Sequence, residues 1–411
     1  MPFKKKLSLR DVPPESICGR IVLVRVDYNV PLDGLHRVAD ITRIERTIPT
    51  LKYLRAAGAK IVLLSHLGRP KGQRDLKYSL SPVVANLENL LGKKIFFCPE
   101  TVGPTATETI SSLKNGDVLL LENTRFCDEE TKGDLDWANQ VRHGADIFVN
   151  DAFGMAHRSH ASVTVVSELV KESGGIAVAG FLMDREIMIL GEALTQPERP
   201  FVGVLGGAKI SGKIDLIEAM LQRVDRLLIG GAMANTFFLA MGRSVGHSLV
   251  EKDFVKCATG LLEEFGNKLL LPVDVMTAKT IAKDVIPTLH DLKTIGEYQS
   301  VVDIGHRTVR IFSDAIMRAE TVIWNGPMGV FEIPSFAQGT FQLAEAAARA
   351  ASEGTCVILG GGDSAAAAKA AGVLGKMTHV STGGGATLEF LSGKKLPGYE
   401  ALSDKKEKEL R

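Results

Sequence analysis

Short runs of β-branched and aliphatic residues alternate with longer amphipathic stretches along the whole chain. In the first half these runs are IVLVRVDYNV, KIVLLSH, KIFFCPE, DVLLLEN and DIFVNDAF; in the second they are PFVGVLGG, RLLIGG, KLLLPVDV, SVVDIG, TVIWNG, CVILGGG and HVSTGGG. Strands that alternate with helices form parallel sheets covered by helices. The sequence therefore predicts an α/β fold.

A break divides the alternation into two series. The stretch GFLMDREIMILGEALTQPERP reads as a long helix that ends in a proline-bounded turn. A chain of 411 residues is also too long for one ordinary core. We expect two Rossmann-like three-layer domains joined by a connector helix and hinge: 1–180, the connector 181–199, and 200–396, with a tail, 397–411, that can pack back on the first domain.

The composition excludes several classes of protein. A net charge of +1 argues against a protein that coats nucleic acid, so any anion site must be local. The five cysteines are scattered without a C-x-x-C pair, which favours a reducing compartment over a disulfide framework or a zinc ribbon. No apolar stretch resembles a secretory signal or approaches the roughly 20 residues of a membrane span. We expect a cytoplasmic protein with neither nucleic-acid nor membrane partners.

Glycines follow four strands of the second half, in LGGAK, IGGAMA, LGGGDS and STGGGAT. Glycine lets the backbone approach an anion closely, and the free amides of a helix start attract negative charge. One such turn alone can be a tight strand-to-helix connection. Four at the carboxyl ends of parallel strands predict a phosphate-binding site.

The first of these turns carries two lysines. Its spacing from Gly207 to Lys213 fits the P-loop pattern G-x-x-x-x-G-K, but Ile214 follows where that motif needs a hydroxyl for Mg²⁺. Lys209 and Lys213 are four apart, so on a helix starting here they share one face and can reach one polyphosphate. The alternative is two solvated lysines.

Asp363 is the carboxylate best placed for a Mg²⁺ ion bridged to phosphate oxygens, because it follows the triple glycine of LGGGDS. The alternative is that it caps the next helix.

The first half has cationic and hydrogen-bonding residues at its strand ends and in the following loops. These residues are Asp27, Asn29, Arg43, His66, Arg69, Arg125 and Arg158. Each arginine alone could be a surface ion-pair partner, but several on one rim bind phosphate and carboxylate bidentately. A metal set of His66, His157 and His160 lacks a further ligand at a suitable spacing. A small, doubly anionic substrate is expected.

Together these blocks resemble the phosphoglycerate kinase family. RVDYNVP, SHLGRPKG, ENTRF, DAFGMAHRSHAS, LGGAKISGKIDLI, WNGPMGVFE, LGGGDS and HVSTGGGATLE follow the family's order from about residue 20 to 395. The resemblance implies a monomeric glycolytic kinase that transfers a phosphoryl group from 1,3-bisphosphoglycerate to ADP with Mg²⁺, giving 3-phosphoglycerate and ATP. It also implies that the P-loop spacing is coincidental and that Ile214 is no defect.

The resemblance assigns roles to particular positions. Those implied to bind phosphoglycerate are Asp27, Tyr28, Asn29, Arg43, His66, Leu67, Gly68, Arg69, Arg125 and Arg158. Those implied to bind the nucleotide are Lys209, Lys213, Asn325, Glu332, Gly361, Gly362, Asp363 and Ser364, with Asp363 beside Mg²⁺. The catalytic set is Arg43, Lys209, Lys213, Gly361 and Gly362.

The chain departs from the family pattern at a few positions. His306 and Arg307 follow Gly305 where a Gly-Pro pair is usual, and Val301 replaces a glycine, so adenine affinity or base selectivity is in question. Gly212 and Thr124 are smaller deviations.

Two other functions stay open at this point. A nicotinamide-dependent dehydrogenase would use the glycine fingerprint that starts at Gly360, although no acidic residue follows at the expected distance of about 20 residues. A scaffold that binds nucleotide without turnover is the non-enzymatic alternative.

Overall fold

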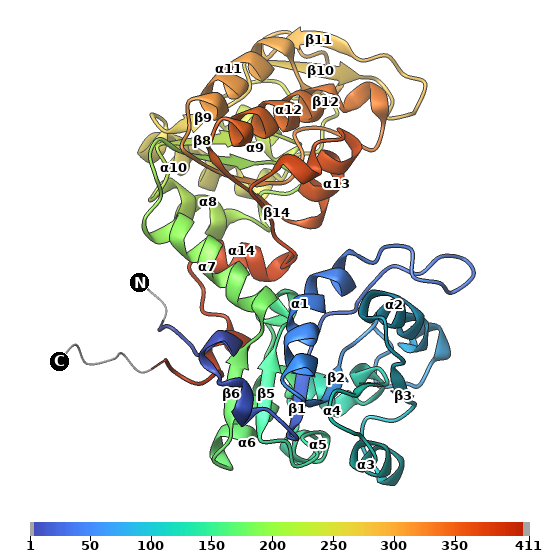
Figure 1. The fold of residues 1–411 in the computed structure, drawn as a ribbon. Helices are drawn as coiled ribbons and strands as arrows, with labels where there is room; N and C mark the ends of the chain where they lie inside the picture. Colours follow the sequence, from blue (N-terminus) through green and yellow to red (C-terminus); the bar gives the residue numbers. More distant parts are fainter. Residues whose placement is uncertain (1–3, 406–411) are drawn as a thin grey trace, which may run out of the picture. The chain divides into compact units, whose positions relative to one another are not determined.

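The computed structural model describes residues 4–405, and the chain divides into two compact units. The first unit contains the described residues up to Met188 together with 395–405, and the second is Ile189–Lys394 (Figure 1). Each unit has a six-stranded parallel sheet. The α/β class with parallel sheets, as the alternation predicts, is confirmed.

The sheet of the first unit has the order β3-β4-β2-β1-β5-β6. Its central strands are buried on both faces, as expected for parallel strands between helix layers. The sixth strand is short and was not identified in the sequence pattern. The strands are β1 Ile21–Arg25, β2 Lys60–Leu64, β3 Phe96–Cys98, β4 Val118–Leu121, β5 Ile147–Asn150 and β6 Ile176–Ala179.

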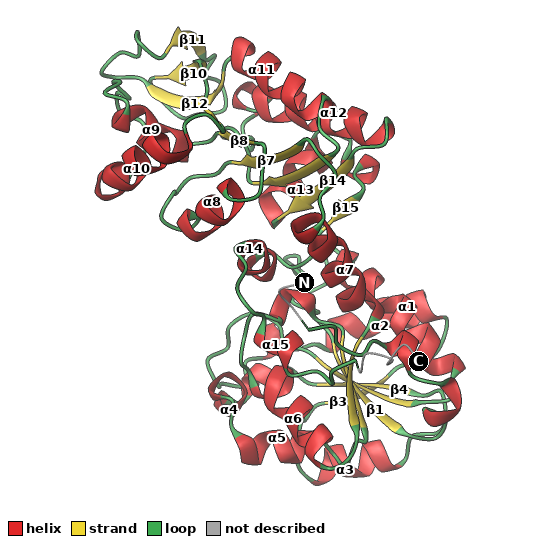
Figure 2. Cartoon of the chain, turned by 90° about the vertical axis from the view of Figure 1, so that its left-hand side faces the viewer, coloured by secondary structure: helices red, strands yellow, loops and turns green. Residues whose placement is uncertain are grey.

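Helices cover both faces of this sheet, with α1 (Thr42–Ala56) and α2 (Ser81–Leu91) on one face and α5 (Leu135–Val141) and α6 (Val166–Glu172) on the other (Figure 2). Arg55 of α1 donates a 2.9 Å hydrogen bond to the carbonyl of Leu91, which ties the first two helices together. The shorter helices are α3 Pro104–Ser111, α4 Asp128–Lys132 and α15 Pro397–Glu400.

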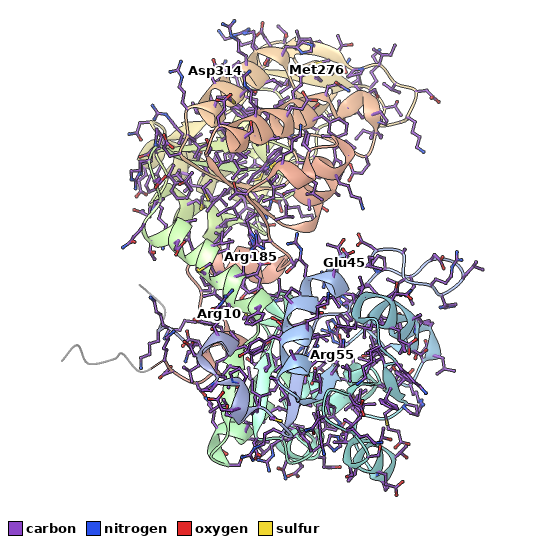
Figure 3. The ribbon with its side chains drawn as sticks, viewed as in Figure 1. Arg10, Glu45, Arg55, Arg185, Met276 and Asp314 are labelled. Carbon is purple, nitrogen blue, oxygen red and sulfur yellow. The ribbon has the colours of Figure 1, made fainter. Side chains whose placement is uncertain are left out.

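The helix α7 (Phe181–Thr195) contains the boundary between the units. Its first turn belongs to the first unit, where Arg10, labelled in Figure 3, donates to Asp184 at 3.1 Å. The carboxylate of the buried Asp151, at the end of β5, accepts from the Leu182 amide at 2.9 Å. The start of α7 is thus attached to the first sheet.

The described part of the tail also belongs to the first unit. The Leu7 amide donates to the Ser403 carbonyl at 2.8 Å, and Asn150 of β5 donates to the Gly398 carbonyl at 3.1 Å. Residues 406–411 of the expected tail lie outside the described residues.

The parallel sheet of the second unit has the order β15-β14-β13-β7-β8-β9. Its core gathers around the fully buried rings of Phe312 and Trp324. The strands are β7 Phe201–Leu205, β8 Arg226–Ile229, β9 Leu269–Leu270, β13 Thr321–Asn325, β14 Cys356–Gly360 and β15 His379–Val380.

A small antiparallel sheet, with the order β11-β10-β12, accompanies it. Its strands are β10 Asp274–Ala278, β11 Thr288–Asp291 and β12 Ser300–Ile304. The runs KLLLPVDV and SVVDIG were assigned to the parallel alternation, and this assignment is wrong for β10 and β12. Pro272 separates β9 from β10, since proline has no N–H for a sheet ladder.

The helices of this unit also form two layers. The helices α11 (His306–Met317) and α12 (Gln338–Ser352) cover one face of the parallel sheet, and α8 (Ile214–Leu221) and α10 (Val255–Phe265) lie on the other (Figure 2). The remaining helices are α9 Met233–Ala240, α13 Gly362–Ala370 and α14 Gly385–Leu391. Over the described residues, no helix has the length and apolar character needed to cross a membrane.

The departure at His306 and Arg307 falls at the start of α11. Gly305 is the N-cap and His306 is the first helical residue, a position where proline is common but not required. The carboxylate of Asp274 accepts from the amides of Arg307 (3.0 Å) and Thr308 (2.8 Å). The helix start is therefore capped without the proline.

Candidate active site

Cationic and polar side chains gather at the carboxyl ends of the first sheet. Asp27 and Asn29 follow β1, His66 follows β2, and Arg125 lies in the short turn after β4. Arg43 lies in the first turn of α1. Carboxyl ends of parallel strands meet at one edge of the sheet, where ligands of open α/β sheets bind.

Direct contacts connect these residues. Arg43 pairs with the carboxylate of Asp27, and Asn29 Oδ1 accepts from the Gly68 amide at 2.9 Å. Arg125 donates to the Gly68 carbonyl at 2.9 Å. The loop SHLGRP is therefore held from two sides, by Asn29 and by Arg125.

The remaining arginines lie at the exposed rim of this cluster. Arg69 and Arg158 are both exposed. The charge of Arg69 acts on Arg125, and that of Arg158 acts on His160, which shows that both lie near the cluster. Burial, and then the charge of Arg25, lower the pKa of Arg125 to about 10.

Two other predicted residues have structural contacts. The fully buried Tyr28 hydroxyl lies 2.9 Å from Thr47 Oγ1, and burial raises its pKa. The carbonyl of the buried Leu67 accepts from Asn123 Nδ2 at 2.7 Å. The Tyr28 side chain and the Leu67 backbone thus brace the loops that carry the charged residues.

Arg25, which sequence reasoning missed, lies beneath the cluster and is fully buried. It donates to the Ser162 hydroxyl at 2.8 Å and to the carbonyls of Val26 and Leu64. Its Nη2 lies 3.3 Å from His66 Nδ1. The available signal was a charged residue inside an otherwise apolar strand. A buried arginine needs hydrogen-bond acceptors and a counter-charge, so its presence there indicates a polar site nearby.

The contact with Arg25 fixes the state of His66. A guanidinium has donors only, so His66 Nδ1 must accept, and the ring proton lies on Nε2. Burial, followed by the charges of Arg25 and Arg125, lowers the pKa of His66 well below its ordinary value. His66 is thus a neutral donor at neutral pH, suited to an anionic ligand.

Glu130 is the buried counter-charge of Arg25, with 3.9 Å between the two groups. Its carboxylate accepts from the Ser162 amide (2.8 Å) and hydroxyl (2.7 Å). A buried ion pair is stable only when its remaining polar atoms are bonded, as they are here. Glu130 and Ser162 were also missed, because nothing local marks a buried helix glutamate as a partner of β1.

In the second unit Lys213 lies at the junction of two glycine turns. Its Nζ donates to the Gly206 carbonyl (2.6 Å), to Asn325 Oδ1 (2.6 Å) and to the Asn325 carbonyl (3.2 Å). A Cβ on Gly207 would come within 3.5 Å of this Nζ, and one on Gly326 within 2.8 Å. The glycines thus leave room for the ammonium group.

The expected helix through both lysines is wrong. Helix α8 begins at Ile214, and Lys213 is its N-cap with φ −134° and ψ 4°. Lys209 is exposed in the preceding loop, and Ile210 between them is buried. Lys209 and Lys213 therefore lie on one loop rather than on one helix face. Lys213 itself has non-helical backbone angles, and its Nζ reaches back to Gly206 and Asn325 instead of lying along a helix face.

The charge of Lys213 is poorly solvated. Burial lowers the pKa of its ammonium to about 8, against an opposing effect of the negative charge of Asp363. Asp363 is exposed in the first turn of α13, whose N-cap is Gly361, so the capping alternative for Asp363 is wrong. A lysine that regains its charge fully when an anion binds fits a phosphate site.

The turn before α13 is braced from below. Ser364 Oγ accepts from the Gly326 amide at 2.6 Å and donates to the Gly360 carbonyl at 2.9 Å, while Asn325 Nδ2 donates to the same carbonyl at 2.7 Å. Gly361, at φ 91°, needs the freedom of glycine. The amides at Gly361 and Gly362 begin the helix and can face an anion.

The last predicted residue of this unit, Glu332, is exposed in the loop before the short helix Pro334–Phe336. In the described part of the chain no three His, Cys, Asp or Glu side chains group as a metal site. Mg²⁺ with nucleotide needs only one or two protein carboxylates, since phosphates and water complete its shell. Asp363 fits that requirement.

Comparisons with known proteins agree with this chemistry. The family model described as "Phosphoglycerate kinase" matches residues 10–394. A phosphoglycerate kinase of Pelodictyon phaeoclathratiforme is 48% identical over 97% of this chain and 100% of its own length. One of Chloroflexus aurantiacus is 50% identical over 97% of this chain and 99% of its own.

Solved structures are similar over the same extent. The structure of phosphoglycerate kinase from Coxiella burnetii has a TM-score of 0.86 at 36% identity, covering 97% of this chain and 98% of that one. The enzyme from Pyrococcus horikoshii has a TM-score of 0.83 at 33% identity, covering 96% and 98%.

Proposed function

The chain belongs to the phosphoglycerate kinase family, and from this we propose how its residues divide the reaction between the two units. The family shows the activity itself: the protein is a glycolytic phosphotransferase acting on phosphoglycerate. The dehydrogenase alternative is set aside, because the glycine fingerprint at Gly360 lies in a kinase.

We propose that the cationic cluster of the first unit binds 3-phosphoglycerate and that the glycine turns of the second bind ADP or ATP. The observation that carries this division is the partly buried ammonium of Lys213, held between two glycine turns. The first unit offers arginines and a neutral histidine donor instead, which suit a phosphate and a carboxylate on one small molecule.

The reaction requires positioning rather than a reactive side chain. In phosphoryl transfer the protein mainly aligns the groups and stabilises charge on the equatorial oxygens. The attacking or leaving group is the substrate carboxylate, which is ionised at neutral pH, so no general base is needed. Lys213, Arg43 and the amides near Gly361 supply the stabilisation, by direct in-line transfer.

Mg²⁺ would be held by Asp363 together with nucleotide phosphate oxygens and would offset their charge. Donor and acceptor bind to different units in this proposal, so we further propose closure over α7 when both are bound. Small-angle scattering that shows no compaction with both ligands, relative to either alone, would overturn that part. A cytoplasmic monomer completes the proposal.

The division between units is tested with a matched pair of exposed cations. Arg158→Ala is expected to weaken 3-phosphoglycerate binding about 10- to 100-fold, the value of a charge-assisted hydrogen bond, and to leave ATP binding unchanged. Lys209→Ala should weaken ATP binding by a similar factor and leave 3-phosphoglycerate binding unchanged. Calorimetric titration of each variant with each ligand measures this, and equal effects of one variant on both ligands would contradict the division.

The depressed pKa of Lys213 gives a second expectation. At pH 8 about half of this ammonium is deprotonated in the free protein, since its pKa is about 8. Bound phosphates favour the charged form, so nucleotide binding at pH 8 should take up about half a proton, and at pH 6 almost none. Titrations in buffers with different ionisation enthalpies measure the uptake, and Lys213→Ala should abolish it. No uptake in the parent protein at pH 8 would refute the proposed contact.

A further inference from the structure

We propose that Glu251 is a positioning residue that clamps the loop bearing Lys209 and Lys213. This inference rests on the proposed role of the two lysines in phosphate binding. Glu251 directly precedes the short helix Lys252–Phe254, on a segment 40 residues away in sequence from its partner Ser211. None of the sequence motifs includes it.

The carboxylate of Glu251 engages the loop through both oxygens. Oε2 accepts from the Ser211 amide at 3.0 Å, and Oε1 accepts from the Ser211 hydroxyl at 2.6 Å. Burial alone would raise the pKa of Glu251, but these hydrogen bonds and the charge of Lys209 lower it. The group is therefore an anion that faces the loop.

Hydrogen bonds to α9 fix the segment that carries Glu251. The Glu251 amide donates to Thr236 Oγ1 at 3.3 Å, and Asn235 Nδ2 donates to the Leu249 carbonyl at 3.0 Å. Asn235 and Thr236 are both buried. The segment that carries the carboxylate is thus fixed to the helix after the second glycine turn.

The clamp reaches Lys213 through the backbone. Glu251 holds Ser211, and the carbonyl of the preceding Ile210 accepts from the Lys213 amide at 2.8 Å. Lys213 in turn places its Nζ on Gly206 and Asn325. A shift at Ile210 therefore moves the start of α8 and the ammonium group.

A simpler role for Glu251 does not explain these contacts. It is the N-cap residue of the short helix Lys252–Phe254, but its side chain makes no capping bond there. Its carboxylate is turned to the lysine loop instead. The charge of Glu251 also partly offsets that of Lys209 while no phosphate is bound.

The test uses Glu251→Gln, Ser211→Ala and the double variant, with the exposed neighbour Asp253→Asn as control. An amide can accept only one of the two Ser211 bonds and loses the charge. We expect Glu251→Gln to lower kcat about 5- to 10-fold with the KM for 3-phosphoglycerate unchanged, because a hydrogen bond to a charged group is lost. In the double variant, the fold-decrease in kcat should be much smaller than the product of the two single-variant decreases, because both changes remove the same contact.

A second readout does not depend on catalysis. Limited trypsin digestion after Lys209 and Lys213 reports how often the loop opens, and we expect cleavage about tenfold faster in Glu251→Gln than in Asp253→Asn. Equal cleavage in these two variants, or independent effects of the Glu251 and Ser211 changes, would overturn the clamp. Faster cleavage of Glu251→Gln with a normal kcat would support the contact between Glu251 and Ser211 but would contradict its effect on Lys213. Failure of the proposed function would show separately, as normal turnover in Lys213→Ala.

Discussion

Replacement of Lys213 by alanine is expected to lower kcat about 10²- to 10³-fold, the usual loss when one preorganised donor to a transition state is removed. Its ammonium is partly buried and already held by the Gly206 carbonyl and by Asn325. It therefore needs little reorganisation when charge develops on the transferring group. Nucleotide affinity should fall far less than turnover, since the glycine turns remain.

Lys394→Ala is the matched control for this prediction. Lys394 belongs to the same unit and forms an exposed ion pair with Asp215 of α8. Its loss should leave kcat unchanged, because exposed ion pairs contribute little. Steady-state kinetics and circular dichroism on both variants separate a catalytic effect from unfolding. A folded Lys213→Ala protein with near-normal turnover would refute the catalytic assignment.

Arg25→Met is expected to lower the free energy of unfolding by about 3–5 kcal/mol, because it leaves the buried Glu130 without its counter-charge. Carbonyls at Val26 and Leu64 lose a donor as well. His66 then loses the contact that places its proton on Nε2. We therefore expect weaker 3-phosphoglycerate binding even where the variant is folded.

Hydrogen exchange of amides in β1 and β2 measures this loss in the first unit alone, which matters because a chain of two units need not unfold in one step. Adding Glu130→Gln should restore part of the stability, since it removes the uncompensated charge. If Arg25→Met lowered the free energy of exchange by less than about 1 kcal/mol, and Glu130→Gln restored none of it, Arg25 and Glu130 would not be energetically coupled.

The residues at strand ends could be predicted from sequence because the chemistry there is local. A glycine turn after a strand, or an arginine just beyond one, predicts an anion-binding position even when the order of the strands in the sheet is unknown. Arg125 and Lys213 were found in this way, and Arg43 in the longer segment that follows the first strand; the structure places each beside other predicted residues. Their individual roles remain proposals.

What the sequence did not show depends on long-range contacts. Arg25 and Glu130 meet across 105 positions of sequence, and neither has a local motif. Strand β12 has the same apolar pattern as a parallel strand, and only its pairing with β10 sets its direction. The four-residue spacing of Lys209 and Lys213 suggested a helix through both, but the backbone is non-helical at Lys213 and the helix begins only at Ile214.

One measurement tests the central claim most directly. The purified protein is mixed with ATP, Mg²⁺ and 3-phosphoglycerate, bisphosphoglycerate formation is coupled to NADH oxidation, and each component is omitted in turn. We expect turnover that requires all three and that falls about 10²- to 10³-fold in Lys213→Ala. No turnover while ATP still binds would contradict the kinase mechanism proposed here and would indicate a nucleotide-binding scaffold instead.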